Sequence, residues 1–182
     1  ERGADINKAN NHGWTPLFIA LWEGHVEVVR ILVERGADIN KANNNGATPL
    51  YIASAKGHVK VVRFLSWEAD INKAKNNGAT PLFIASAKGH LEMVRILAER
   101  EADINKAVSD GTTPLNIATQ EGHDKVVMVL AEKGAEINNV LNDGCFPLYI
   151  ASQNGHVGVV RLLLNKEVNV NQAKNNGVTS LL

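Results

Sequence analysis

Histidine is the residue type whose recurrence first suggests a chemical function. Five of the six histidines follow a glycine at regular intervals along the 182 residues: His25, His58, His90, His123 and His156. A histidine cluster could bind zinc, which needs its ligand nitrogens at roughly 2 Å from one ion. Equivalent positions in stacked repeats lie about 8–10 Å apart, one helix-packing distance. We therefore predict that these histidines are structural residues at helix starts and that they hold no metal.

Cys145 is the only cysteine and the second candidate for chemistry. A nucleophilic cysteine needs a neighbouring base and a group that stabilises the oxyanion, and no motif around Cys145 provides them. The sequence also lacks a glycine-rich phosphate loop, a Gly-x-Ser-x-Gly motif and paired carboxylates. We predict no enzymatic activity and no cofactor. A single cysteine allows no internal disulfide, which favours a reducing compartment, the cytoplasm or the nucleus.

The charge balance excludes several classes of partner. Lysine plus arginine and aspartate plus glutamate number 19 each, so the formal net charge is zero. A balanced chain lacks the basic surface that binds DNA, RNA or an anionic membrane. No apolar run approaches the roughly 20 residues of a membrane-spanning helix, and no signal-peptide pattern opens the chain. We expect a monomer that binds a protein, with no nucleic-acid partner and no membrane insertion.

A block of about 33 residues, a length typical of stacked repeats, recurs five times and must position these side chains. Thr15-Pro16 is typical of a helix start, because threonine can cap an unpaired N–H group and proline needs no donor in the first turn. Gly24 can close this short helix in the left-handed conformation, and Gly36 ends a second, longer helix. Asn45-Gly46 indicates a tight turn in the following loop. Each unit is predicted to be two short helices and a hairpin-like loop, held by stacking on its neighbours.

The order of motifs within each unit resembles the ankyrin repeat. In the first unit, Gly-x-Thr-Pro-Leu (13–17), Gly-His (24–25), Val-Val-x-x-Leu (28–32) and Gly-Ala-Asp-Ile-Asn (36–40) follow one another, and the other units repeat this order with substitutions. The resemblance covers the whole chain, as five complete units and a partial unit at each end: 1–9, 10–42, 43–74, 75–107, 108–140, 141–173 and 174–182. It implies one mainly α solenoid domain of stacked helix-turn-helix units with projecting β-hairpin loops and a concave face. From the partial units we expect further repeats or domains to flank this chain.

Departures from the family pattern predict local differences. The position after the Pro-Leu pair is usually histidine in the family, but here it holds Phe18, Tyr51, Phe83, Asn116 and Tyr149. Because an aromatic ring replaces a polar link between units, we expect more apolar packing there. In three units, glutamate replaces the glycine that closes the second helix: Glu68, Glu101 and Glu167. We expect these helix ends to close differently, because a non-glycine residue in the left-handed conformation costs roughly 1–2 kcal/mol. The second unit is one residue short between Phe64 and Ala69. We expect a distortion there, with Trp67 filling the gap.

Comparison of the units with one another indicates a binding surface. The core positions barely change, whereas the residue after the loop-tip glycine and the pair before Gly-His differ between units. In ankyrin repeats these places face the concave groove, where protein partners bind. The candidate partner-binding residues are His12, Trp14, Trp22, Glu23, Lys56, Lys88, Thr112, Gln120, Glu121 and Asn154. The alternative explanation for the variation is neutral drift at exposed positions.

Trp14 and Trp22 are the strongest of these candidates, because tryptophan is the commonest hot-spot residue of protein interfaces. We expect both to be exposed on one face beside His12 and Glu23. The alternative is that they pack against a preceding repeat.

The sequence therefore favours a non-enzymatic module that binds a protein partner on its concave face and hairpin tips. The near-identity of the second and third units favours an alternative, a structural or elastic spacer within a larger multidomain protein. A third hypothesis, an enzyme or the anchoring part of one, requires a catalytic domain outside this chain.

Overall fold

The computed structural model describes residues 4–65 and 68–166, and within these ranges it contains ten helices and no strand. The predicted mainly α class is confirmed, and the loops are hairpin-like without forming strands in the described ranges. In chain order the helices are α1 (Pro16–Glu23), α2 (Val26–Glu34), α3 (Pro49–Lys56), α4 (Val59–Leu65), α5 (Pro81–Ala87), α6 (Leu91–Glu99), α7 (Pro114–Gln120), α8 (Asp124–Glu132), α9 (Pro147–Gln153) and α10 (Val157–Leu164).

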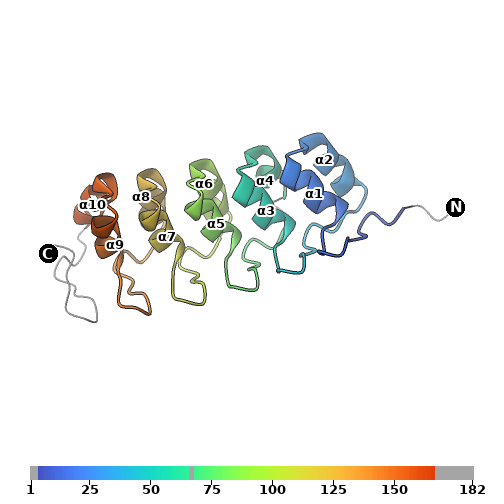
Figure 1. Ribbon diagram of the computed structural model, residues 1–182. Coiled ribbons are helices and arrows are strands. Elements are labelled where there is room, and N and C mark those ends of the chain that lie inside the picture. The colour runs from blue at the N-terminus through green and yellow to red at the C-terminus, as the bar shows by residue number, and fades with distance from the viewer. Residues whose placement is uncertain (1–3, 66–67, 167–182) are drawn as a thin grey trace.

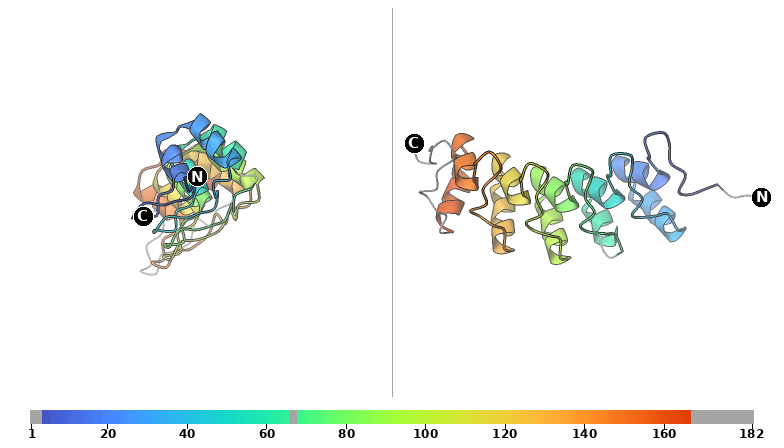
Figure 2. Two further views of the ribbon diagram at one scale, coloured as in Figure 1. Left: turned by 90° about the vertical axis from the view of Figure 1, so that its right-hand side faces the viewer. Right: turned by 90° about the horizontal axis from the view of Figure 1, so that it is seen from below.

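The helices pair within units, and the pairs stack side by side into an elongated array (Figure 1). Each odd-numbered helix packs against the even-numbered helix that follows it and against the odd-numbered helices of adjacent units. The loops that connect successive pairs all project from one side of the array (Figure 2). Because chain order and spatial order coincide, equivalent side chains of successive units fall into rows.

Threonine and proline begin the odd-numbered helices, as the sequence predicts. In four of the five described units the threonine Oγ1 accepts a hydrogen bond of 3.1 to 3.3 Å from the N–H three residues later: Thr15, Thr48, Thr80 and Thr113. Phe146 holds this position before α9, where it makes no such bond and is fully buried. The caps pair N–H groups that a helix start leaves open. They fix each odd-numbered helix to the base of its loop.

The loops form one continuous edge. In the loop that precedes α3, the Asn43 N–H donates to the Ala47 carbonyl and the Gly46 N–H donates to the Asn43 carbonyl, both at 2.9 Å. The Asn44 N–H donates to the His12 carbonyl of the preceding loop at 3.2 Å. Further from the tips, one asparagine per unit accepts through Oδ1 a hydrogen bond of 2.8 to 3.0 Å from a backbone N–H of the next unit: Asn7, Asn40, Asn72 and Asn105.

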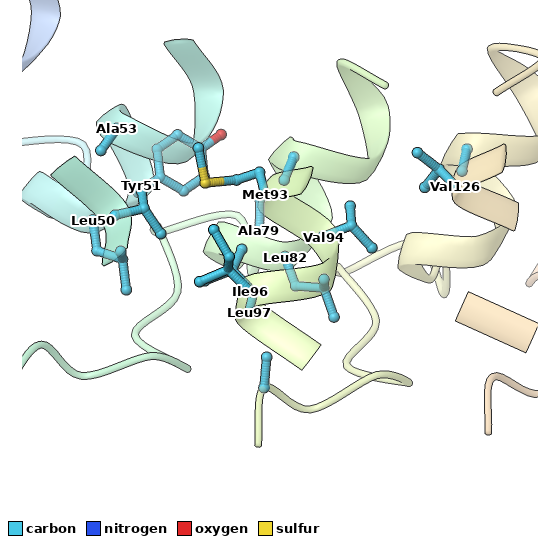
Figure 3. Packing of buried hydrophobic residues seen from close by; sticks show 14 of the residues in the cluster. Leu50, Tyr51, Ala53, Ala79, Leu82, Met93, Val94, Ile96, Leu97 and Val126 are labelled. Carbon is cyan, nitrogen blue, oxygen red and sulfur yellow. The ribbon is translucent and has the colours of Figure 1, made fainter. Parts of the chain in front are cut away.

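The core is a series of contacts between adjacent units, as Figure 3 shows for the centre of the array. Val28 in the first unit is 46% exposed, whereas its equivalents Val61, Met93 and Val126 are at most 2% exposed because a preceding unit covers them. Burial at this position therefore depends on the neighbouring unit, as expected of a solenoid.

The Gly-His histidines join successive units. The imidazole of His123 packs against Gly89 of the unit before, where an added Cβ would lie 2.7 Å from His123 Cε1. In three of these histidines, Nε2 also lies within hydrogen-bonding distance of a carbonyl oxygen of the preceding unit. The distances are 3.2 Å for His90, 3.2 Å for His123 and 2.8 Å for His156. Across the described ranges, no three histidine, cysteine, aspartate or glutamate side chains form a group that could hold a metal.

The departures from the family pattern have mixed outcomes. Glu101 has a φ of 59°, the only positive φ of a non-glycine residue in the described ranges. The end of α6 thus closes as glycine would close it, and the expectation of a different closure is wrong there. Phe18 and Tyr51 are buried, as expected of apolar packing at that position, whereas Phe83 and Tyr149 are half-buried. Asn116 is buried but forms a capping box with Thr113, so its packing is polar. The expected distortion beside Trp67, and Glu167, lie outside the described residues.

Candidate partner-binding surface

The ten candidate residues lie at the carboxyl end of an odd-numbered helix, in all five units, and at the tip of a loop, in the first and fourth units. The helix-end candidates are all exposed: Trp22, Glu23, Lys56, Lys88, Gln120, Glu121 and Asn154. At the tips, His12 is exposed, while Trp14 and Thr112 are half-buried. These ten residues are named the inner surface below.

The residue after the tip glycine is less available than its variability suggests. Ala47, Ala79 and Cys145 hold this position in three units and are 3%, 2% and 8% exposed. The thiol of Cys145 donates a hydrogen bond to Asp143 Oδ2 at 3.2 Å. In these three units the residue after the tip glycine is therefore inaccessible to a partner, and the exposed part of the inner surface lies mainly at the helix ends.

Four rings gather in the first unit. Trp14 stacks on Phe18 and on Trp22, with ring centroids 5.5 and 5.9 Å apart, and His12 lies 5.6 Å from Trp14. Phe18 and Trp22 are four residues apart and therefore fall on one side of α1, and Trp14, in the loop just before the helix, packs against both. Asn10 Oδ1 fixes the tip by accepting hydrogen bonds from the N–H groups of His12 and Trp14 at 2.9 and 3.0 Å.

Trp14 and Trp22 differ in exposure. Trp22 is 40% exposed. Trp14 is half-buried, packs on Phe18, and borders an open pocket at the start of the array that Ile19 and Val28 also line. This pocket lies on the face that a preceding unit covers in the interior of the array. The expectation of two substantially exposed tryptophans therefore fits Trp22 and only partly fits Trp14, which is also a packing residue.

Two lysine side chains extend across unit boundaries and place their ammonium groups over aromatic rings. Lys56 Nζ lies 3.8 Å from the centroid of the Trp22 ring, and Lys75 Nζ lies 5.3 Å from that of Tyr51. An ammonium group over an aromatic face at an exposed site contributes about 0.5–1 kcal/mol. Sequence reasoning included Lys56 but missed Lys75 and Tyr51. A signal was present, since Tyr51 stands where the family has histidine, but its partner lies in the next unit.

Carboxylates and amides occupy the fourth and fifth units. Asp110 lies at the fourth tip, where hydrogen bonds from the Thr112 hydroxyl and N–H lower the pKa of its carboxyl. Glu121 Oε1 accepts a hydrogen bond from Gln120 Nε2 at 3.4 Å. Asn154 donates through Nδ2 to the Ile150 carbonyl of its own helix at 2.9 Å. Asp110, which sequence reasoning also missed, adds a second negative charge to this part of the surface.

Comparison with known families agrees with the repeat architecture. A family model described as ankyrin repeats (3 copies) matches residues 2–75 and 67–140, and one described as ankyrin repeats (many copies) matches residues 120–164. No curated protein matches the chain. Among the described residues, no helix is both long and apolar enough to span a membrane. Since the two family models together match residues 2–164, the chain belongs to the ankyrin-repeat family.

Proposed function

We propose that this chain is a non-enzymatic binding module that holds a partner protein on its concave face and loop tips, through the inner surface. Ankyrin repeats generally act as protein–protein interaction modules. The observation that carries the proposal is Trp22, a large ring that is 40% exposed at the end of α1 and supported from within the unit by Trp14. Aromatic residues held rigidly in this way bury much area on binding and lose little entropy.

A stretch of protein chain suits this surface better than a small molecule. The exposed candidates extend along helix ends from α1 to α9, one or two per unit, without converging on one point. Small-molecule sites are instead concave pockets with a few convergent polar groups. The proposal includes a monomeric module in solution, which molar mass from light scattering tests.

A matched pair of substitutions tests the proposal. Trp22→Ala removes the exposed ring of the inner surface, and Met128→Ala removes a side chain that is 36% exposed on α8, outside that surface. We expect both variants to melt near the wild-type temperature. In affinity capture from the source proteome with quantitative mass spectrometry, Trp22→Ala should lower the recovery of specific partners about tenfold, as a hot-spot residue would. Met128→Ala should not.

The alternative of a structural spacer has one observation in its favour. The second and third units carry Ala55-Lys56 and Ala87-Lys88 at the same place, so this stretch of the surface has little individual character. A spacer predicts that partner recovery is the same for wild type, Trp22→Ala and Met128→Ala. That result would replace the binding proposal by the spacer.

A further inference from the structure

The charges of the inner surface are sorted along the array. The second and third units present Lys56 and Lys88 at the ends of α3 and α5. The fourth unit presents Glu121 at the end of α7 and Asp110 at its loop tip. Glu23, in the first unit, is the exception to a division of the surface into basic units followed by an acidic unit. Along the helix-end row the order is therefore an aromatic ring with one carboxylate, then two ammonium groups, then a carboxylate.

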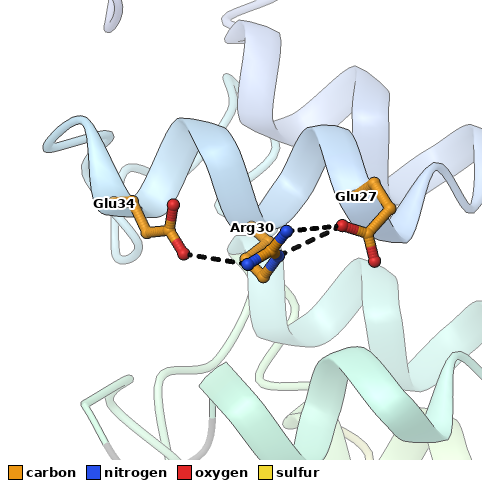
Figure 4. Close-up of polar contacts among 3 residues, drawn as sticks. All are labelled: Glu27, Arg30 and Glu34. Carbon is orange, nitrogen blue, oxygen red and sulfur yellow. Dashed lines mark hydrogen bonds and ion pairs between the residues drawn. The ribbon is translucent and has the colours of Figure 1, made fainter.

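Some charged side chains of the even-numbered helices instead form ion pairs within the molecule. Arg30 on α2 binds Glu27 at 2.9 Å and Glu34 at 3.4 Å (Figure 4). Arg63 on α4 binds Glu92 on α6 at 2.7 Å. Within the described ranges, the lysines of the inner surface make no ion pair.

Lys56 in particular is positioned without being neutralised. Its ammonium lies over Trp22, 3.8 Å from the ring centroid, where the ring holds the cation in place but supplies no opposite charge. In the fourth unit, the pKa of the Asp110 carboxyl is lowered by hydrogen bonds from Thr112, which favours its charged form. The second and fourth units thus present charges of opposite sign, each of which a partner of complementary charge can bind.

We propose that the inner surface selects an extended protein segment with an acidic stretch opposite Lys56 and Lys88 and a basic stretch opposite Asp110 and Glu121, with an apolar residue beside Trp22. This inference rests on the proposed function and adds the chemistry of the partner. Adjacent units lie about 8–10 Å apart and an extended chain advances about 3.3 Å per residue, so the acidic and basic stretches should be separated by about 3–6 residues. The apolar residue lies on the acidic side.

The experiment selects the segment from random sequences, so that the natural partner need not be identified first. A display library of random 15-residue peptides is panned on the full chain, and the enriched peptides are measured by fluorescence polarisation. We expect enriched peptides to carry an apolar residue, an acidic stretch and a basic stretch in that spatial order, in either chain direction. Their affinity should fall on raising the salt concentration, since exposed charge pairs are screened.

Charge reversals in the same two units supply the matched comparison. Lys56→Glu with Lys88→Glu changes the inner surface, and Lys60→Glu with Arg95→Glu makes the same change in net charge on exposed positions of α4 and α6. The first variant should bind the selected peptides about tenfold more weakly, and the second should bind them as wild type does. A peptide with its acidic residues changed to lysine should recover affinity for the first variant.

The outcomes separate the two proposals. Enriched peptides that lack the charge order, or that bind both double variants equally, would overturn the inference about charge. If those peptides still lose affinity to Trp22→Ala, the proposed function stands. If no selected peptide loses affinity to any variant of the inner surface, the inference about charge and the proposed function are both overturned, provided that circular dichroism shows each variant to be folded.

Discussion

The first and third units place similar side chains in different surroundings. In the third unit, Met93 and Ile96 of α6 are 0% and 5% exposed, because the second unit covers them. In the first unit, the equivalent Val28 and Ile31 of α2 are 46% and 51% exposed. The residue types are alike and the helices have the same length of 9 residues. Burial in this molecule is thus conferred by the neighbouring unit, and stability should follow it.

The largest effect that tests this comparison is truncation at equivalent positions. Met93→Ala should lower the free energy of unfolding by about 2–5 kcal/mol, and Leu82→Ala should do the same, because each leaves a cavity in a closed core. Val28→Ala should change it by less than about 0.5 kcal/mol, as expected of an exposed site. Urea unfolding followed by circular dichroism measures all three. Equal losses for Met93→Ala and Val28→Ala would show that stacking does not control stability here.

A smaller effect is expected where the histidines join the units. In Gly89→Ala the new methyl would lie 2.7 Å from His123, and the backbone φ of 68° is unfavourable for alanine. Strain and overpacking together should lower stability by about 2–4 kcal/mol. Gly36→Ala is the control, since its φ is 85° but an added Cβ meets no described atom within 4 Å. It should lose only the strain, about 1–2 kcal/mol. Losses of equal size in denaturant melts would mean that His123 contributes nothing.

Features that one unit determines by itself were predictable from the sequence, and features that need two units were less so. The Thr-Pro helix starts and the Asn-Gly turn follow from local backbone chemistry, and the structure contains both. The pairing of Lys75 with Tyr51 was not foreseen, because it depends on how far a side chain reaches across a boundary. The half-burial of Trp14 has a different cause, since Trp14 precedes α1 and its packing on Phe18 depends on how the loop enters the helix.

The helix end at Glu101 gives a prediction of opposite sign. Its φ of 59° lies in the left-handed region, which glycine adopts without the steric penalty of a side chain. Glu101→Gly should therefore raise the free energy of unfolding by about 0.5–1 kcal/mol, less than the full penalty because glycine also gains entropy in the unfolded chain. Arg100→Gly is the control, because Arg100 has an ordinary φ of −102° and gains nothing from glycine. A neutral or destabilising Glu101→Gly in denaturant melts would show that this conformation carries no strain.

The smallest effect concerns pH at the boundary between the first two units. Burial lowers the pKa of His58, and the positive charges of Lys56 and His90 lower it further, against an opposing contribution from the Leu21 carbonyl. Well above the unfolded value of about 6.5 the imidazole is neutral in both states, so folding does not have to desolvate a charged imidazolium. As the pH falls below that value, the unfolded chain binds a proton that the folded chain resists, and stability decreases.

The melting temperature, measured at pH 7.5, 6.5 and 5.5, should therefore fall less in His58→Gln than in wild type. Equal pH dependence of the melting temperature in wild type and His58→Gln would contradict the conclusion that burial of His58 between the first two units makes stability sensitive to pH.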